Sequence, residues 1–204
     1  TFYDPATDRW DRLLADDWSD PHIRVIRSFG SGVYIGTQDG LTLKPTPTRS
    51  DVCASAAPGC ILPSYVVNDF ALQGTDLWVA TQSGLGRYNG ETWDSAGALP
   101  QGSVGHDAVS LALFDGELWE ATGTAVRRLE GSSWVATRSG TARLVVTGGS
   151  LFALTGSEVL EWNAASEVWD AAVLPVTPPG EVQDVEVVGE TICLATTHGL
   201  ALGP

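Results

Sequence analysis

Residues 66–93 read VVNDFALQGTDLWVATQSGLGRYNGETW, and this stretch decides the fold. Apolar and polar residues alternate in short runs, which are separated by the turn signals Gln73-Gly74, Ser83-Gly84 and Asn89-Gly90. The Asn-Gly pair is the strongest signal, because a type I′ hairpin turn needs a positive φ at both central residues. The stretch therefore predicts four short antiparallel strands in one meander, which form one blade. A single blade of this size cannot bury both of its faces, so we expect the unit to repeat.

The predicted unit does repeat, at intervals of about 40 residues, the length of a propeller blade. Alignment on the second strand gives a mostly aromatic column, formed by Tyr34, Trp78, Trp119, Phe152 and Cys193. Each of these residues is followed by a threonine, and these are Thr37, Thr81, Thr122, Thr155 and Thr196. A further column, in the fourth strand, holds Trp10, Trp93, Trp134 and Trp169. We interpret the aromatic columns as packing between neighbouring blades, not as a cofactor site.

These repeats predict an all-β fold, a β-propeller of four-stranded antiparallel blades in a single domain that spans residues 1–204. The predicted blades are about 22–64, 65–106, 107–140, 141–180, and 181–204 together with 1–18. We expect residues 9–14 to supply the fourth strand of the last blade and so to close a ring of five blades. One third strand is then surplus, because residues 2–3 and 200–202 both fit that position. The alternative is an excerpt of a larger propeller.

Three stretches resemble the repeats of the two-component-regulator propellers, which occur in ectodomains of bacterial sensors and in secreted proteins. They are DLWVATQSGLGRY (76–88), GVYIGTQDGL (32–41) and YDPATDRW (3–10). The resemblance covers nearly the whole chain, although the Gly before Thr is kept only at Gly36 and Cys193 interrupts the aromatic column. It implies a sensory, exported bacterial module. The motifs specify the blade and not a ligand, so the resemblance does not fix the function.

Composition limits the partners. Hydrophobic residues make up 43% of the chain, enough for a sizeable core. A net charge of −14 argues against nucleic acid and against anionic membrane surfaces, because both would repel the protein. No apolar run is long enough to span a bilayer.

The cysteines indicate an oxidising compartment. Cys53 and Cys60 flank a short loop with a Pro-Gly turn, and a disulfide between them would fit an extracellular or periplasmic protein. A metal site is the alternative, but it lacks a second cysteine pair or a nearby histidine. Cys193 is expected to be a buried free thiol.

One face of the predicted ring carries the loops that enter the first strands and those that join second to third strands. The candidate ligand residues on this face are His22, Asp39, Asp69, His106, Asp107, Asp184 and His198. Histidine and aspartate converging at the mouth of a propeller could bind a divalent cation or a polar ligand, although the set does not specify a metal. Trp18, which is flanked by carboxylates, could stack on a sugar ring or fold over a neighbouring blade. No other cofactor is expected.

Sequence signatures of enzymes are missing: there is no Gly-x-Ser-x-Gly elbow, His-Glu-x-x-His motif or phosphate-binding glycine loop. We therefore expect a non-catalytic exported recognition or scaffold module that presents the loops of one face to a protein partner or a larger assembly. A carbohydrate-binding, lectin-like propeller is the first alternative. A glycosidase or lyase, with carboxylates contributed by different blades, is the second.

Overall fold

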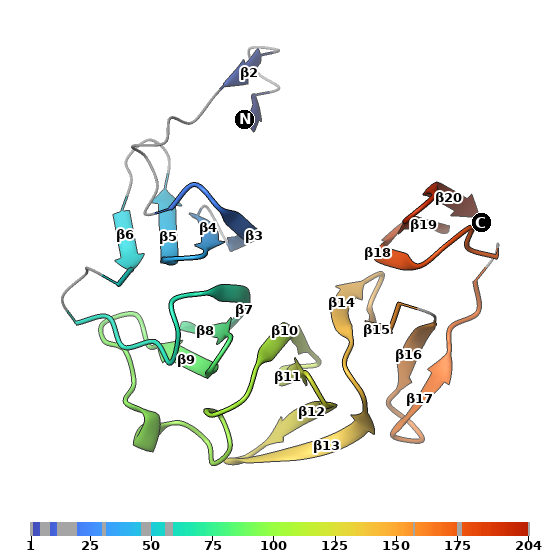
Figure 1. Cartoon of the computed structure of the whole chain (residues 1–204). Helices are drawn as coiled ribbons and strands as arrows, with labels where there is room; N and C mark the ends of the chain where they lie inside the picture. The colour runs from blue at the N-terminus through green and yellow to red at the C-terminus, as the bar shows by residue number, and fades with distance from the viewer. Residues whose placement is uncertain are drawn as a thin grey trace.

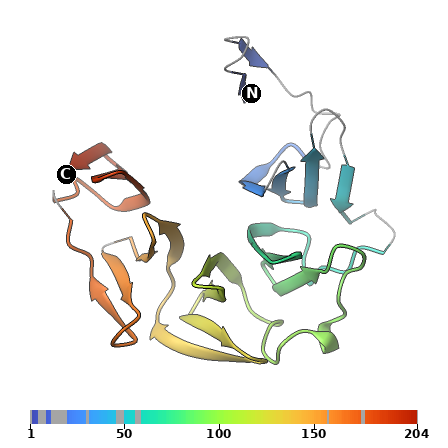
Figure 2. The same cartoon turned by 180° about the vertical axis from the view of Figure 1, so that it is seen from behind.

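A computed structural model describes residues 2–4, 9–11, 20–29, 32–45, 50–55, 59–156, 158–174 and 177–203. For residues 2–4, 9–11, 43–45 and 50–52 it describes the backbone alone. Figure 1 shows antiparallel sheets arranged side by side around an arc, and Figure 2 shows the same arc from behind. The all-β architecture expected from the repeats is confirmed. No helix in the described parts of the chain is long and apolar enough to cross a membrane.

Within each sheet the strands follow chain order, so each sheet is a meander. The first sheet contains β3 (Ile23–Phe29), β4 (Gly32–Thr37), β5 (Gly40–Pro45) and β6 (Ser50–Cys53). The second contains β7 (Val67–Gln73), β8 (Asp76–Thr81) and β9 (Gly84–Tyr88). The third contains β10 (Ala108–Phe114), β11 (Glu117–Thr122), β12 (Ala125–Glu130) and β13 (Ser133–Ser139). The fourth contains β14 (Arg143–Thr147), β15 (Ser150–Leu154), β16 (Val159–Asn163) and β17 (Val168–Ala171), and the fifth contains β18 (Val182–Val188), β19 (Thr191–Thr196) and β20 (Gly199–Gly203).

The second sheet differs from the predicted four strands, because its outer strand is reduced to one bridge between Tyr88 and Trp93. The Asn89-Gly90 pair does not form the predicted type I′ turn: Gly90 has φ +96°, but Asn89 does not have a positive φ, and its side chain accepts bonds from the amides of Glu91 and Thr92. Pairing stops after Asp94, whose amide donates to the Arg87 carbonyl and whose carboxylate binds the Arg87 side chain. The chain then enters the short 3-10 helix η2 (Ala96–Ala98).

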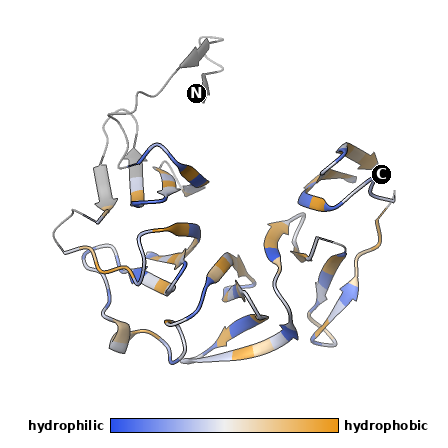
Figure 3. Ribbon diagram, viewed as in Figure 1, coloured by the Kyte–Doolittle hydropathy of each residue, from blue (hydrophilic) through white to orange (hydrophobic). Residues whose placement is uncertain are grey.

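Neighbouring sheets pack through the aromatic column of the second strands. Trp78 and Trp119 are 1% and 0% exposed, which confirms their predicted packing role. Trp78 lies in one cluster with Leu111 and Leu118 of the third sheet, and Trp119 lies in another with Leu144 of the fourth. Figure 3 shows apolar residues on the inner strands β7, β10 and β14, near the centre of the arc. The core is therefore a series of apolar layers between successive blades.

The two ends of the arc leave equivalent apolar positions uncovered. The first-strand position occupied by Ile26 is 54% exposed, whereas its counterparts Phe70, Leu111, Leu144 and Val185 are at most 3% exposed. In the third strand, Leu200 is 67% exposed, whereas its counterparts Leu41, Leu85, Val126 and Val159 are at most 6% exposed. Each internal position is covered by the adjoining blade, so the first and fifth sheets do not cover each other.

The N-terminal strands correct the predicted closure of the ring. β2 (Arg9–Asp11) pairs with β1 (Phe2–Asp4), and Tyr3 lies opposite Trp10 in a separate two-stranded sheet. Among the described residues β2 does not pair with β20, and the fifth sheet has three strands. The physical reason is the surplus third strand: β1 already takes the third-strand position beside β2. Residues 12–14 of the predicted closing strand lie outside the described residues.

Replacement of Trp119 by alanine tests the packing between blades. Because the ring is fully buried between the third and fourth sheets, Trp119→Ala should lower the free energy of unfolding by about 3–5 kcal/mol in urea denaturation. Val173→Ala is the control, since Val173 is 90% exposed, and it should change stability by about 0.5 kcal/mol at most. An equally small loss for Trp119→Ala would contradict the packing role.

Candidate functional site

A repeated threonine fixes the loop between the second and third strands of each blade. Its hydroxyl donates a hydrogen bond of 2.7–3.3 Å to the carbonyl three residues later. The donors are Thr37, Thr81, Thr122, Thr155 and Thr196, the column that follows the aromatic residues in the sequence. Glycine serves the same loops: Gly84 has φ +120°, and a Cβ there would lie 2.5 Å from the Ser103 carbonyl oxygen. One face of the arc thus carries a row of loops with a common, rigid base. We call it the loop face.

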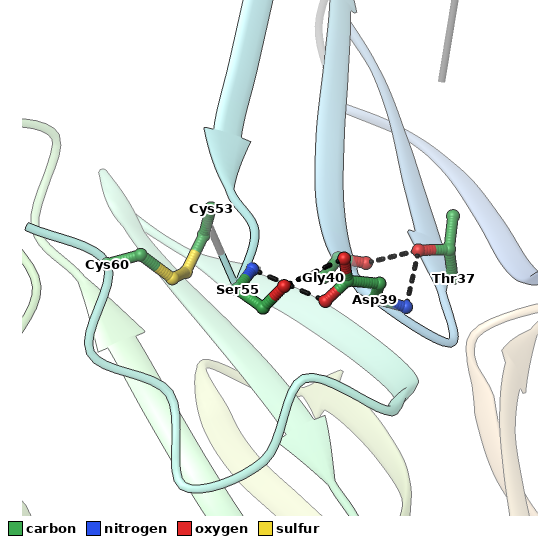
Figure 4. The surroundings of a disulfide bond; sticks show 6 residues. All are labelled: Thr37, Asp39, Gly40, Cys53, Ser55 and Cys60. Atoms are coloured by element: carbon green, nitrogen blue, oxygen red, sulfur yellow. Dashed lines mark hydrogen bonds between the residues drawn. A yellow bond between two sulfur atoms is a disulfide. The ribbon is translucent and has the colours of Figure 1, made fainter. Parts of the chain in front are cut away.

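At the first blade a disulfide holds the loop face in place. The predicted bond between Cys53 and Cys60 is present, and Cys53 is fully buried in the apolar cluster between the first and second sheets. Figure 4 shows Ser55, just after Cys53, donating from its amide and hydroxyl to the Asp39 carboxylate, at 3.3 and 2.9 Å. The Asp39 amide in turn donates to Thr37. Asp39 is therefore a bonded part of the loop framework.

The three histidines have separate partners. His22 is exposed and bonds to Asp20 at 2.8 Å, while His198 is exposed and lies 3.1 Å from the Thr197 hydroxyl. His106 bonds to Glu120 at 2.6 Å. No group of three His, Cys, Asp or Glu side chains able to hold a metal ion occurs in the described parts of the chain. The divalent cation considered above gains no support from this geometry.

Glu120 forms the base of a buried charged cluster in the third blade. Its side chain is 0% exposed; one oxygen meets His106 and the other accepts from Arg127 at 2.6 Å. Arg127 also donates to the Gly102 carbonyl at 2.8 Å and stacks over Trp134, with 4.7 Å between guanidinium carbon and ring centroid. The cluster ties the loop that enters β10 to the body of the blade. A buried carboxylate is tolerated here because both of its oxygens are bonded.

Sequence reasoning did not single out Glu120 or Arg127, although a signal was present. The second-strand position of Glu120 holds Ile35, Val79, Ala153 and Leu194 in the other blades. A carboxylate in an otherwise apolar and buried column requires a partner. That partner lies across the ladder, since Glu120 and Arg127 are opposite each other in β11 and β12.

Polar side chains join the first three blades at the start of their first strands. Arg24 and Asn68 both sit at a register shift of the strand, a β-bulge, which directs the side chain away from the ladder. Arg24 donates to the Asn68 side-chain oxygen at 2.9 Å, and the Asn68 amide donates to the Asp107 carboxylate at 3.0 Å and to the Ala108 carbonyl at 2.7 Å. Asp107 of the predicted set therefore links blades.

A second set of hydrogen bonds, which we call the inner relay, runs across four blades. Arg27 of β3 pairs with Asp69 of β7 at 3.1 Å. Asp69 accepts from the Ser110 hydroxyl of β10 at 2.9 Å, and Ser110 accepts from the Leu144 amide of β14 at 3.1 Å. Burial raises the pKa of Asp69 above its ordinary value, while Arg27 and the amides of Leu111 and Phe70 oppose the rise. Asp69 is thus a structural junction and is not exposed on the loop face.

Two hollows lie along this inner side of the arc. The smaller, of about 190 Å³, is lined by residues of the inner relay and by Arg24 and Asn68 of the first set of hydrogen bonds, and it also includes Arg143. The larger, of about 440 Å³, shares Arg27 and Arg143 and is otherwise mostly apolar. Asp184 of the predicted set lines the larger hollow and pairs with Arg143 at 3.3 Å. The arrangement can bind a small polar or charged group against an apolar wall.

A different hollow, of about 870 Å³, lies between the second and third blades and includes the turns Gly116–Glu117 and Gly131–Ser133 opposite the loop face. Arg87 and Arg128 line it, each stacked over the tryptophan across its ladder, at 5.2 and 5.6 Å from the ring centroid. Asp76 and Asp94 hold Arg87, and three glutamates hold Arg128. These arginines are already paired. Trp18 lies outside the described residues, so the carbohydrate-binding alternative stays a prediction.

Comparison with known proteins gives a fold and no family. No family model and no curated protein matches the chain. The extracellular domain of the putative one component system BT4673 from B. thetaiotaomicron aligns with a TM-score of 0.73 and 16% identity over 96% of this chain and 29% of that chain. PorZ, an essential bacterial surface component of the type-IX secretion system of Porphyromonas gingivalis, aligns with a TM-score of 0.64 and 16% identity over 91% of this chain and 25% of that chain. The WD40 β-propeller domain of Doa1 aligns with a TM-score of 0.59 and 9% identity over 87% of this chain and 61% of that chain.

The fold is that of a β-propeller. Identities this low show the fold alone, and the chain spans less than a third of the first two structures. The sequence predicts a resemblance to two-component-regulator propellers. The type of protein agrees with this prediction, because BT4673 is also described as a putative hybrid two component system. Membership of that repeat family stays a prediction.

The buried carboxyl of the inner relay predicts a pH effect. Because the pKa of Asp69 is raised in the folded state, the folded propeller holds this proton more tightly than the unfolded chain does. The stability advantage over Asp69→Asn should be largest below the ordinary value of 3.8 and should fall as the pH rises through the raised pKa. Urea denaturation of both proteins across this pH range measures the difference. A difference that grows with pH would show instead that the Arg27 ion pair outweighs burial.

The disulfide predicts a redox effect on stability. Cys60→Ser should lower the free energy of unfolding by about 2–3 kcal/mol, because it frees a short loop in the unfolded chain. This variant is preferable to Cys53→Ser, because Cys53 is fully buried and the hydroxyl of a serine at that position would have no hydrogen-bond partner. Reductant should reproduce the loss in the native propeller and leave Cys60→Ser unchanged. Equal sensitivity of both proteins to reductant would contradict this role.

Proposed function

We propose that this propeller is a non-catalytic exported recognition or scaffold module, which presents its loop face to a protein partner or to a larger assembly. The observation that carries the proposal is the threonine repeated in the five blades, which gives five loops the same rigid base. Loops that are already ordered lose less conformational entropy on binding, so they form a favourable docking surface.

Variation at the loop tips supports recognition. The tips carry Gln38-Asp39 in the first blade, Gln82-Ser83 in the second, Gly123-Thr124 in the third and Thr197-His198 in the fifth. Different side chains at the tips of similar loops allow one fold to distinguish partners. The repeated blade determines where each tip lies, and the side chains at the tip determine which groups it can bind.

Two observations support export. The disulfide forms where the chain has a short cysteine loop, as in proteins of oxidising compartments. The similar solved structures include the extracellular domain of a putative one component system and a bacterial surface component. An acidic surface would favour a partner with basic groups at its contact site.

Photo-crosslinking in the native source tests the proposal. A benzophenone amino acid is placed at Gln82 or at His198, both exposed on the loop face, and in a matched control at Glu190, which is exposed in the turn at the opposite end of the strands. We expect the two loop-face positions to give the same crosslinked protein and Glu190 to give none. Crosslinking from Glu190 alone, or from none of the three, would reject the loop face as the docking surface.

A further inference from the structure

We propose that the smaller inner hollow binds the carboxylate of a small organic acid through Arg24, Arg27 and Arg143. This site lies on the inner side of the arc, so the inference goes beyond the proposed role of the loop face. Arg24 and Arg27 belong to β3 and Arg143 belongs to β14, yet all three line one hollow of about 190 Å³. The chain has only 11 Lys and Arg residues against 25 Asp and Glu, so this concentration of positive charge is notable.

The ion pairs among the described residues leave one of these guanidinium groups uncompensated. Arg27 pairs with buried Asp69, whose oxygens also accept from Ser110, Leu111 and Phe70. Arg143 pairs with Asp184 at 3.3 Å, but both side chains are about half exposed, so water competes with this pair.

Arg24 is the one of the three that has no carboxylate partner in the described parts of the chain. It donates to the neutral Asn68 side chain at 2.9 Å, and none of the described Asp or Glu side chains forms an ion pair with it. Asp69 and Asp184 form ion pairs with Arg27 and Arg143, so Arg24 carries the one charge of the three that no ion pair among the described residues offsets. A single carboxylate would balance that charge, whereas a dianion would exceed it.

Arginine geometry favours this class of ligand. The planar guanidinium presents parallel N–H donors that match the two oxygens of a carboxylate. Arg24 and Arg143 are both exposed, so a ligand can reach them from solvent. Ser110 and Asn68 add polar groups to the same lining.

The larger hollow defines the rest of the ligand. It shares Arg27 and Arg143 with the smaller one and has a volume of about 440 Å³. Its lining includes the half-buried apolar side chains of Phe29, Leu72 and Leu113. An apolar or aromatic body would therefore lie along this wall while its carboxylate faces the arginines.

Negative groups in the larger hollow restrict the ligand further. Glu186 lines it, accepts a bond from the Thr147 hydroxyl at 2.8 Å, and lies in the same wall as Asp184. A second carboxylate on the body of the ligand would be repelled there. The predicted class is thus a monocarboxylic acid with an apolar body.

Calorimetric titration with phenylacetate and with its neutral analogue phenylacetamide tests the proposal. We expect phenylacetate to bind with a dissociation constant of about 1 mM or tighter, and the amide to bind at least about tenfold more weakly because it lacks the charge-assisted bonds. Added salt should weaken the binding of phenylacetate only. Equal affinity for acid and amide, or no binding of either, would overturn the proposal. Tighter binding of inorganic phosphate would overturn the choice of a monocarboxylate.

Matched variants locate the site. Arg24→Gln should weaken phenylacetate binding about tenfold, since a hydrogen bond to a charged group is lost. Arg138→Gln makes the same change in net charge and should leave the affinity unchanged, because among the described residues the Arg138 side chain bonds to the Ser139 carbonyl alone. Urea denaturation of both variants checks that each remains folded. An equal loss of affinity in both variants would show a long-range charge effect and would reject the site.

Discussion

The inner relay, from Arg27 through Asp69 and Ser110 to Leu144, is the constraint on which the arrangement of the blades depends. Backbone ladders hold each sheet together, but among the described strands the inner edge of every first strand is unpaired. Buried amides on that edge need partners. The Asp69 carboxylate and the Ser110 hydroxyl supply them to Leu111 and Leu144 of the next blades. These side chains therefore accept the hydrogen bonds of the inner-edge amides and also set the spacing of the first four blades.

Regular features of the propeller could be predicted from the sequence because they recur. The aromatic column and the threonine after it appear at a fixed place in each unit, and packing and loop fixation follow directly from them. The disulfide could also be predicted, because its two cysteines are close together in the sequence. Irregular features were harder to predict. The partners of Glu120 come from a neighbouring strand and from a loop, so only a register and a fold together show that His106 is bonded and not free.

Strand pairing between distant parts of the chain could not be decided from pattern. Both β1 and β20 fit the third position of a blade, and the sequence favours neither as the neighbour of β2. The structure pairs β1 with β2, which leaves the third strand of the fifth sheet without an outer neighbour among the described strands. The exposure of Ile26 and Leu200 has a different cause: no adjoining blade among the described strands covers these positions, whereas Leu85 of the second sheet, which also has three strands, is 0% exposed. A periodic pattern specifies what a blade contains but not which blade completes it.

Apart from Arg138, the arginines with described side chains fall into two groups with different chemistry. Arg87, Arg127 and Arg128 lie over tryptophan rings and form ion pairs with carboxylates, so their charge is neutralised within the blades. Arg24, Arg27 and Arg143 converge on the inner hollow instead. A net charge of −14 repels anions at long range, so a weakly held anion gains nothing by approaching. Only an anion that forms short, directional bonds with these guanidinium groups overcomes that repulsion. The negative net charge of the protein therefore makes the inner hollow selective for such an anion.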